Sequence, residues 1–138
     1  SKSNSNNLIN NLDDIKRPNK SNQVIGYLKG EPANGVFSNY HSNGSLNHKM
    51  EFKDGYGFGQ DIQYFANGNQ KSITHLVNGW PNGSMIIFYE NGNIKSKCIF
   101  DDNGKIQGDA QWYNQDGSIK GNGIYSNNKI VNCSGNCN

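Results

Sequence analysis

The side chains that most often perform catalysis are few in this chain, and their spacing matches no catalytic or metal-binding motif. The histidines are His41, His48 and His75, and no pair has the His-x-x-x-His spacing of a helical metal site. The sequence also lacks a G-x-S-x-G elbow, a phosphate-binding P-loop and an H-E-x-x-H motif. We therefore expect no catalytic residue, no metal site and no cofactor.

Two other groups resemble chemical sites only superficially. The acidic pairs Asp13-Asp14 and Asp101-Asp102 do not gather the several oxygen ligands that Ca²⁺ requires, so solvated charge is expected. The glycine-rich string from Gly55 to Gly59 resembles a phosphate loop, but no helical pattern follows it. It is expected to be the turn between two repeated units. Together these patterns predict that the protein is not an enzyme.

The three cysteines are Cys98, Cys133 and Cys137, and the last two form the string C-S-G-N-C. That spacing permits either a small disulfide ring or two free thiols. A disulfide would favour an oxidising compartment. With the polar N-terminal stretch, the spacing favours a secreted or cell-envelope location over a cytoplasmic one.

The charge balance limits the classes of partner. Thirteen Lys and Arg face eleven Asp and Glu, giving a formal net charge of +2, without a dense basic cluster. Nucleic acids and anionic lipid surfaces are normally bound by such clusters, so neither is an expected partner. The sequence contains no apolar run long enough for a membrane-spanning helix. A hydrophobic content of 33% is low for a thick core and fits a thin sheet with much solvated surface.

The strongest pattern is a tandem repeat. Units begin at Gly35, Gly59, Gly83 and Gly108, so successive units are 24, 24 and 25 residues apart. Each unit has an aromatic residue five positions after its first glycine and then closes on Asn-Gly or Asp-Gly. The structural repeat residues expected from this pattern are Gly35, Tyr40, Gly44, Gly59, Tyr64, Gly68, Gly83, Phe88, Gly92, Gly108, Tyr113 and Gly117. A fixed period of this size indicates one supersecondary unit copied along a row.

Turn chemistry predicts how each unit folds. A three-residue loop over Ser42, Asn43 and Gly44 pairs Tyr40 with Leu46 and places glycine where a left-handed conformation is needed. A two-residue turn would instead pair Tyr40 with a polar residue. The three-residue loop therefore predicts β-hairpins, with Tyr40, Leu46, Met50 and Phe52 on one face of the sheet. It puts His48 on that face as well, and His41 and His75 on the other.

Large apolar side chains also gather on the second face, in the middle of the array. Four of them, Phe65, Ile87, Tyr89 and Trp112, are predicted partner-binding residues, because exposed aromatic residues are favoured at protein interfaces. The alternative is that the N-terminal segment covers them. Lysines near these positions would give the surface a polar rim.

The chain divides into three parts. Residues 1–22 combine a polar tether with an amphipathic helix expected over residues 8–16, capped by Ser5 or Asn6 and stopped by Pro18. Residues 23–131 form the repeat array, and residues 132–138 form a cysteine-containing tail. Unpaired sheet edges near Val24–Leu28 and Ile124–Ile130 make edge-to-edge self-association a further expectation.

The unit G-x-x-x-x-[YF]-x-x-[ND]-G resembles the MORN repeat, and most closely the variant MORN repeat common in bacteria. The resemblance implies an all-β fold, a single elongated and twisted antiparallel meander of stacked hairpins with about nine or ten strands. It also implies a non-enzymatic module for protein–protein interaction or scaffolding. Two alternatives remain open: an antitoxin or immunity protein that neutralises a cognate toxin, and a secreted or surface-anchored protein that contacts host or neighbouring cells.

Overall fold

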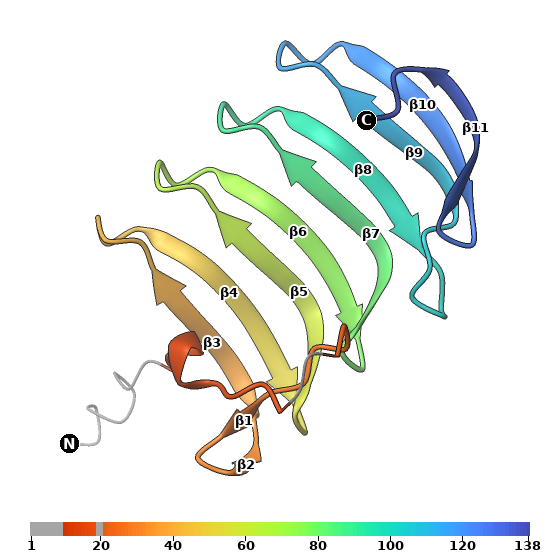
Figure 1. The fold of residues 1–138 in the computed structure, drawn as a ribbon. Helices are drawn as coiled ribbons and strands as arrows, with labels where there is room; N and C mark the ends of the chain where they lie inside the picture. The colour runs from red at the N-terminus through yellow and green to blue at the C-terminus, as the bar shows by residue number, and fades with distance from the viewer. Residues whose placement is uncertain (1–9, 19–20) are drawn as a thin grey trace.

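A computed structural model of the chain describes residues 10–18 and 21–138. Nine strands form one antiparallel sheet in which each strand pairs with its neighbours in sequence (Figure 1). Their bounds are β3 Gly35–Tyr40, β4 Leu46–Lys53, β5 Tyr56–Tyr64, β6 Gln70–Val77, β7 Trp80–Phe88, β8 Ile94–Phe100, β9 Gly108–Tyr113, β10 Ile119–Ser126 and β11 Lys129–Gly135. The expected all-β meander is therefore confirmed.

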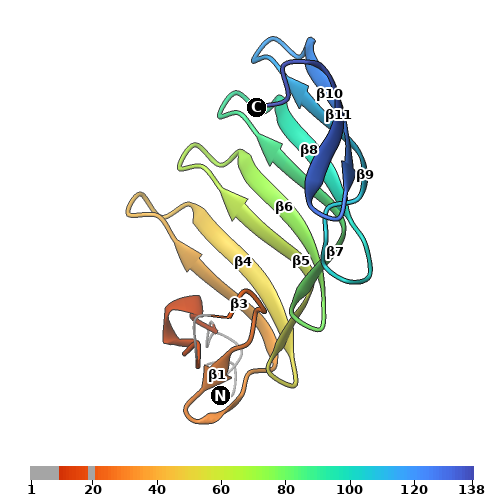
Figure 2. The same ribbon diagram turned by 45° about the vertical axis from the view of Figure 1, so that its right-hand side comes forward.

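The hairpin turns line up along two margins of the sheet, as Figures 1 and 2 show. At the upper margin each turn is the expected three-residue loop. In the first of them, the His41 N–H donates to Ser45 O and the Gly44 N–H donates to His41 O. The expected pair of Tyr40 with Leu46 is also present. Gly44 has φ +89°, a conformation that glycine adopts without strain.

Most of the turns at the lower margin are shorter, whereas the turn between β8 and β9 repeats the three-residue loop, with the Asp101 N–H donating to Lys105 O and the Gly104 N–H to Asp101 O. Asp54-Gly55 and Asn78-Gly79 are two-residue turns in which both residues have positive φ. This is the type that matches the twist of two-stranded hairpins. The glycine-rich string therefore divides in two: Gly55 belongs to the turn, whereas the residues from Tyr56 to Gly59 belong to β5.

Below each upper turn, the second strand of the hairpin carries one extra residue. Asn47, Lys71, Lys95 and Lys120 have no cross-strand partner toward the first strand of their hairpins. Such a β-bulge moves every later side chain of its strand to the opposite face. The prediction that Met50 and Phe52 share a face with Tyr40 is therefore wrong: Met50 pairs with Phe37, and Tyr40 is on the other side.

The buried core lies on the face that carries Phe37. Its buried members are Ala33, Phe37, Met50, Phe52 and Leu76, with Leu12, Ile15, Val24 and Leu28 packed against them. The last four residues belong to the N-terminal segment, residues 10–18 and 21–28, which crosses the lower part of β3–β7 (Figure 1). We call the side of the sheet that carries Phe37 the inner face and the opposite side the outer face.

The expected helix over residues 8–16 is wrong in length. Residues 8 and 9 and the expected caps Ser5 and Asn6 lie outside the described residues, and the remainder forms only a 3-10 turn, Leu12–Asp14, capped by Asn11. The reason is competition from the sheet, because Asn10 accepts a hydrogen bond from the Ser38 N–H at the edge of β3. Farther along, the segment forms the short hairpin of β1, Tyr27–Leu28, and β2, Glu31–Pro32.

A ladder of asparagines connects the upper turns. The side-chain amide nitrogens of Asn43, Asn67 and Asn91 donate to main-chain oxygens in the next upper turn along, over 2.9, 3.1 and 3.0 Å. The fourth turn has Asp116, and no upper turn follows it in the sheet. A carboxylate satisfies this position because only an acceptor is needed there: Asp116 Oδ1 accepts from the Ser118 hydroxyl and N–H, which lowers the pKa of Asp116.

This ladder gives a testable difference between repeats. We expect Asn91→Asp to lower the free energy of unfolding by about 1 kcal/mol, because it removes the bond to Gln115 O and places a carboxylate near that oxygen. We expect Asp116→Asn to leave the urea unfolding midpoint unchanged, because Asp116 makes no bond to a neighbouring turn. Urea denaturation measures both, and equal losses from the two variants would contradict the asymmetry.

Candidate protein-interaction face

A single row of cross-strand pairs defines the middle of the inner face. Ile87 pairs with Ser72 on one side and Ser96 on the other, and Ser96 pairs with Trp112. Residues paired in this way project to the same face of a sheet. The row continues from Ser72 through Gln63 and His48 to Asn39, two positions after Phe37, so Ile87 and Trp112 are inner-face residues. Phe65 and Tyr89, just beyond the ends of β5 and β7, are two positions after Gln63 and Ile87 and follow on the same side. The strand pairing thus places all four predicted binding residues on one face.

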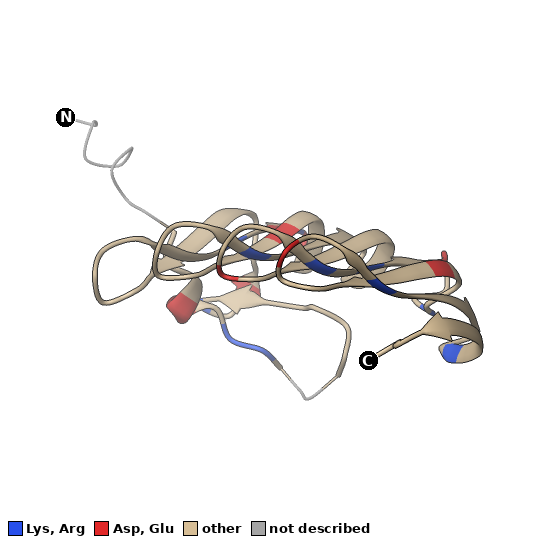
Figure 3. Cartoon of the chain, turned by 90° about the horizontal axis from the view of Figure 1, so that it is seen from above, with Lys and Arg blue, Asp and Glu red and all other residues tan. Residues whose placement is uncertain are grey.

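These four side chains lie beyond the part of the inner face that the N-terminal segment covers. The buried cluster ends at Leu76 in β6, whereas Phe65, Ile87, Tyr89 and Trp112 are all half-buried. At the far end, the inner side of Gly121 faces the backbone of Asn136: an ideal Cβ there would lie 2.1 Å from Asn136 O. Figure 3 shows that the N-terminal segment and the C-terminal end project from the same side of the sheet.

Trp112 and Tyr89 also contribute to the fold itself. The Trp112 ring lies 6.3 Å from the Tyr125 ring and packs over Gly123, where a Cβ would come within 3.0 Å of the indole. The Tyr89 hydroxyl donates to Tyr113 O over 2.8 Å and so connects adjacent hairpins. The sequence pattern did not reveal this bond. Tyr89→Ala would therefore affect both stability and binding, whereas Tyr89→Phe removes only the hydroxyl.

The bulge lysines form the upper rim of the inner face. Lys71 Nζ lies 5.8 Å from the centre of the Phe65 ring, and Lys95 Nζ lies 5.7 Å from that of Tyr89. Such cation–π contacts are weak at an exposed site. Lys120 Nζ donates to Asn138 O over 3.0 Å. Each hairpin after the first thus presents one ammonium group at an equivalent position.

The histidines are held by contacts within the chain. His41 Nε2 is 2.8 Å from Tyr64 O, His48 Nε2 is 2.5 Å from Asp61 Oδ1, and His75 Nδ1 is 2.9 Å from Asn82 O. Two of the predicted faces are wrong because of the bulge. His48 lies on the inner face together with His41 and not opposite it, and His75 lies on the outer face. Within residues 10–18 and 21–138, no three His, Cys, Asp or Glu side chains gather as a metal site would require.

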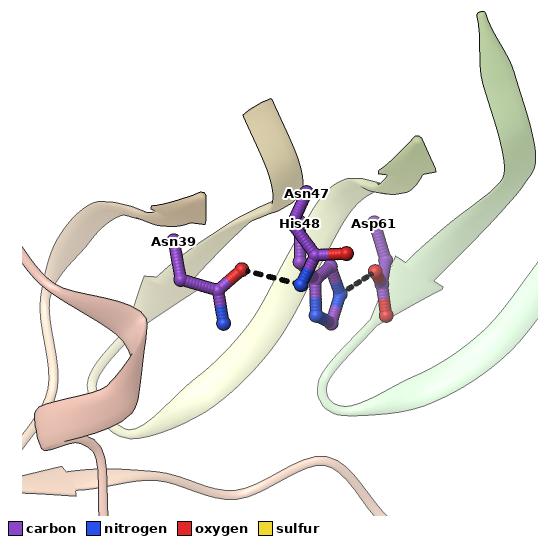
Figure 4. Close-up of polar contacts among 4 residues, drawn as sticks. All are labelled: Asn39, Asn47, His48 and Asp61. Atoms are coloured by element: carbon purple, nitrogen blue, oxygen red, sulfur yellow. Dashed lines mark hydrogen bonds and ion pairs between the residues drawn. The ribbon is translucent and has the colours of Figure 1, made fainter. Parts of the chain in front are cut away.

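A polar cluster stands beside the N-terminal segment on the inner face. Figure 4 shows Asn47 donating to Asn39 over 3.0 Å, next to the contact between His48 and Asp61. Asn39 in turn donates to Asp13 Oδ1 over 3.0 Å, which ties the 3-10 turn to β3. Asp13 therefore has a positioning role in the fold. In the other acidic pair, Asp102 Oδ1 accepts a hydrogen bond from the Asn82 side chain, so this residue also has a partner within the fold.

Of the two arrangements that the cysteine spacing permits in the tail, the structure has the disulfide ring. Cys133 and Cys137 are joined by a disulfide, and Cys137 Sγ also lies 3.4 Å from Asn122 O. Cys98, which pairs with Met85 on the inner face, keeps a free thiol. Burial raises the pKa of the Cys98 thiol. Among the described residues, no helix is both long enough and apolar enough to cross a membrane.

This arrangement defines a class: a repeat protein built from hairpins stacked in one sheet, with one face partly covered by its own terminal segments. Residues 33–54 and 81–102 match the family model described as the MORN repeat variant. These two stretches are therefore MORN repeats of the variant type. Repeats of this family are generally modules that bind proteins or membranes.

No curated protein matches the chain significantly. Among solved structures, the chain is similar to a mutant of S. aureus TarM in complex with fondaparinux, α-GlcNAc-glycerol and UDP. The sequences are 10% identical, the TM-score is 0.44, and the match covers 94% of this chain but 26% of that one. The chain thus spans about a quarter of the length of that protein.

Proposed function

We propose that this protein is a non-enzymatic protein-binding module and that it binds its partner on the inner face between its two terminal segments. The observation that carries the proposal is the position of Phe65, Ile87, Tyr89 and Trp112. All four lie on one face, and they begin where the cover given by the N-terminal segment ends. Aromatic residues in such a setting supply much of the binding energy of protein interfaces.

The test compares the two faces by affinity capture from cells that contain the native protein. We expect the double variant Phe65→Ala, Trp112→Ala to lose at least nine-tenths of the captured partner. The matched control is Tyr40→Ala, Ile99→Ala, because these outer-face side chains are 51% and 49% exposed. Loss of the partner in the control but not in the inner-face variant would contradict the proposal. Thermal denaturation of each variant separates lost binding from unfolding.

The disulfide supports a second, compatible proposal, that the protein acts outside the cytoplasm and contacts another cell. Small disulfide rings persist in oxidising compartments. If the protein is exported, the tail peptide of the native chain should be two daltons lighter than the same peptide after reduction. A peptide isolated with both thiols free would count against export. An antitoxin role is the special case in which the captured partner is a single toxin, and the same capture experiment would identify it.

A further inference from the structure

Between β6 and β10, the charged side chains on the inner face of the sheet are basic. Every Asp and Glu within residues 70–126, all of which the structure describes, lies in a turn, in a loop or on the outer face. These residues are Glu90, Asp101, Asp102, Asp109 and Asp116. Three lysines from the same stretch, Lys71, Lys95 and Lys120, stand on the inner face at the bulge positions. Within residues 10–18 and 21–138, no lysine forms an ion pair.

From these observations we propose that the occupant of the inner face is an acidic amphipathic helix of a partner protein. This proposal rests on the protein-binding function above and specifies the chemistry of the partner. The apolar side of the helix would pack on Ile87 and Trp112, and its carboxylates would pair with Lys71 and Lys95. Lys120 Nζ already donates to a main-chain oxygen, Asn138 O, so an ammonium group at this position can reach an oxygen acceptor on the inner face.

The spacing of the lysines fits a helix that runs across the strands. Equivalent residues in successive hairpins are two strands apart, or about 9.5 Å. Residues seven apart in an α-helix are separated by about 10.5 Å along the axis and lie on the same side. Acidic residues at positions i and i+7 would therefore reach Lys71 and Lys95 together.

Backbone chemistry favours a helix over an extended peptide. A peptide on the face of a sheet, unlike one at its edge, cannot form main-chain hydrogen bonds with the sheet. An extended segment would leave its N–H and C=O groups without partners against Ile87 and Trp112, and that is costly in a buried contact. A helix satisfies its own backbone, and packing a helix on a sheet is a common way to bury an apolar face.

Cys98 supplies a reporter for this surface. It carries the free thiol and lies on the inner face, in the strand that also carries Ser96 and Lys95. A helix across the inner face would shield this thiol from alkylation. The tail disulfide does not react with an alkylating reagent, so the signal comes from Cys98.

The test uses a synthetic 18-residue amphipathic helix with leucines on one side and glutamates seven residues apart. We expect it to bind the full chain and to slow alkylation of Cys98 at least fivefold. Lys71→Glu together with Lys95→Glu should weaken binding at least tenfold, and a peptide with lysines in place of the glutamates should restore it. The matched control is Lys49→Glu with Lys97→Glu, two exposed outer-face lysines, which should bind like wild type.

Several outcomes would overturn the proposal. They are no binding of the acidic helix, equal binding of the lysine peptide to wild type, and equal weakening by the outer-face variant. Binding of phosphatidylserine vesicles that depends on Lys71 and Lys95 would assign the surface to a lipid instead. Dimers that shield Cys98 without peptide would assign it to a second copy of the chain. If Trp112 is needed for native capture but Lys71 and Lys95 are not, protein binding stands and only the acidic helix fails.

Discussion

We expect Phe37→Ala to lower the free energy of unfolding by about 3–5 kcal/mol, whereas Tyr40→Ala, three positions away in β3, should cost less than about 1 kcal/mol. Phe37 is 1% exposed and meets the Phe52 ring edge-to-face at 5.7 Å. Tyr40 is 51% exposed on the outer face. The loss at Phe37 combines the removed apolar burial, the cavity left behind and the lost aromatic pair.

Chemical denaturation of the two variants measures this difference directly. The pair also tests which face of the sheet forms the core, because the repeat aromatic Tyr40 is the residue that the sequence pattern marks. A larger loss for Tyr40→Ala than for Phe37→Ala would mean that the inner and outer faces have been exchanged.

The second large effect is expected at the lower margin, where Gly79→Ala should cost at least about 3 kcal/mol. Gly79 has φ +81°, and a Cβ there would lie 2.6 Å from Val24 O. Val24 also donates its N–H to Gly79 O over 2.8 Å, so the N-terminal segment would have to move away. The substitution therefore combines backbone strain with loss of the contact that holds this segment.

Gly117→Ala is the matched control for Gly79→Ala. Gly117 has φ +91°, but nothing lies within 4 Å of an added Cβ. Its cost should be about 1 kcal/mol, the backbone term alone. Similar unfolding midpoints for the two variants would show that the N-terminal segment does not pack on the lower turns.

Much of the fold could be predicted from the repeat. The spacing of the glycines, with Asn-Gly or Asp-Gly after an aromatic residue, determines the hairpins, their upper turns and their order. The bulge could not be predicted in the same way, because its residues Asn47, Lys71 and Lys95 are ordinary polar strand residues. In β7 the run Met85-Ile86-Ile87-Phe88 is apolar on both faces, so alternation does not reveal which side is the core.

The four residues predicted to bind a partner share one face despite this error. Phe65 and Tyr89 lie above the bulges, where the predicted register holds, and Ile87 and Trp112 are in the first strands of their hairpins. The N-terminal segment was harder to predict, because its apolar spacing fits a helix. The edge of β3 offers Asn10 a backbone hydrogen bond instead, and this long-range contact is not visible in the local pattern.

The central claim, that the inner face binds a partner, is tested most directly by site-specific photo-crosslinking at two adjacent residues of β8. A photoreactive side chain at Ser96 would stand on the inner face beside Trp112, and one at Lys97 would stand on the outer face beside Gln111. We expect a crosslinked partner from position 96 in native cells and none from position 97. Adducts from position 97 alone would contradict it.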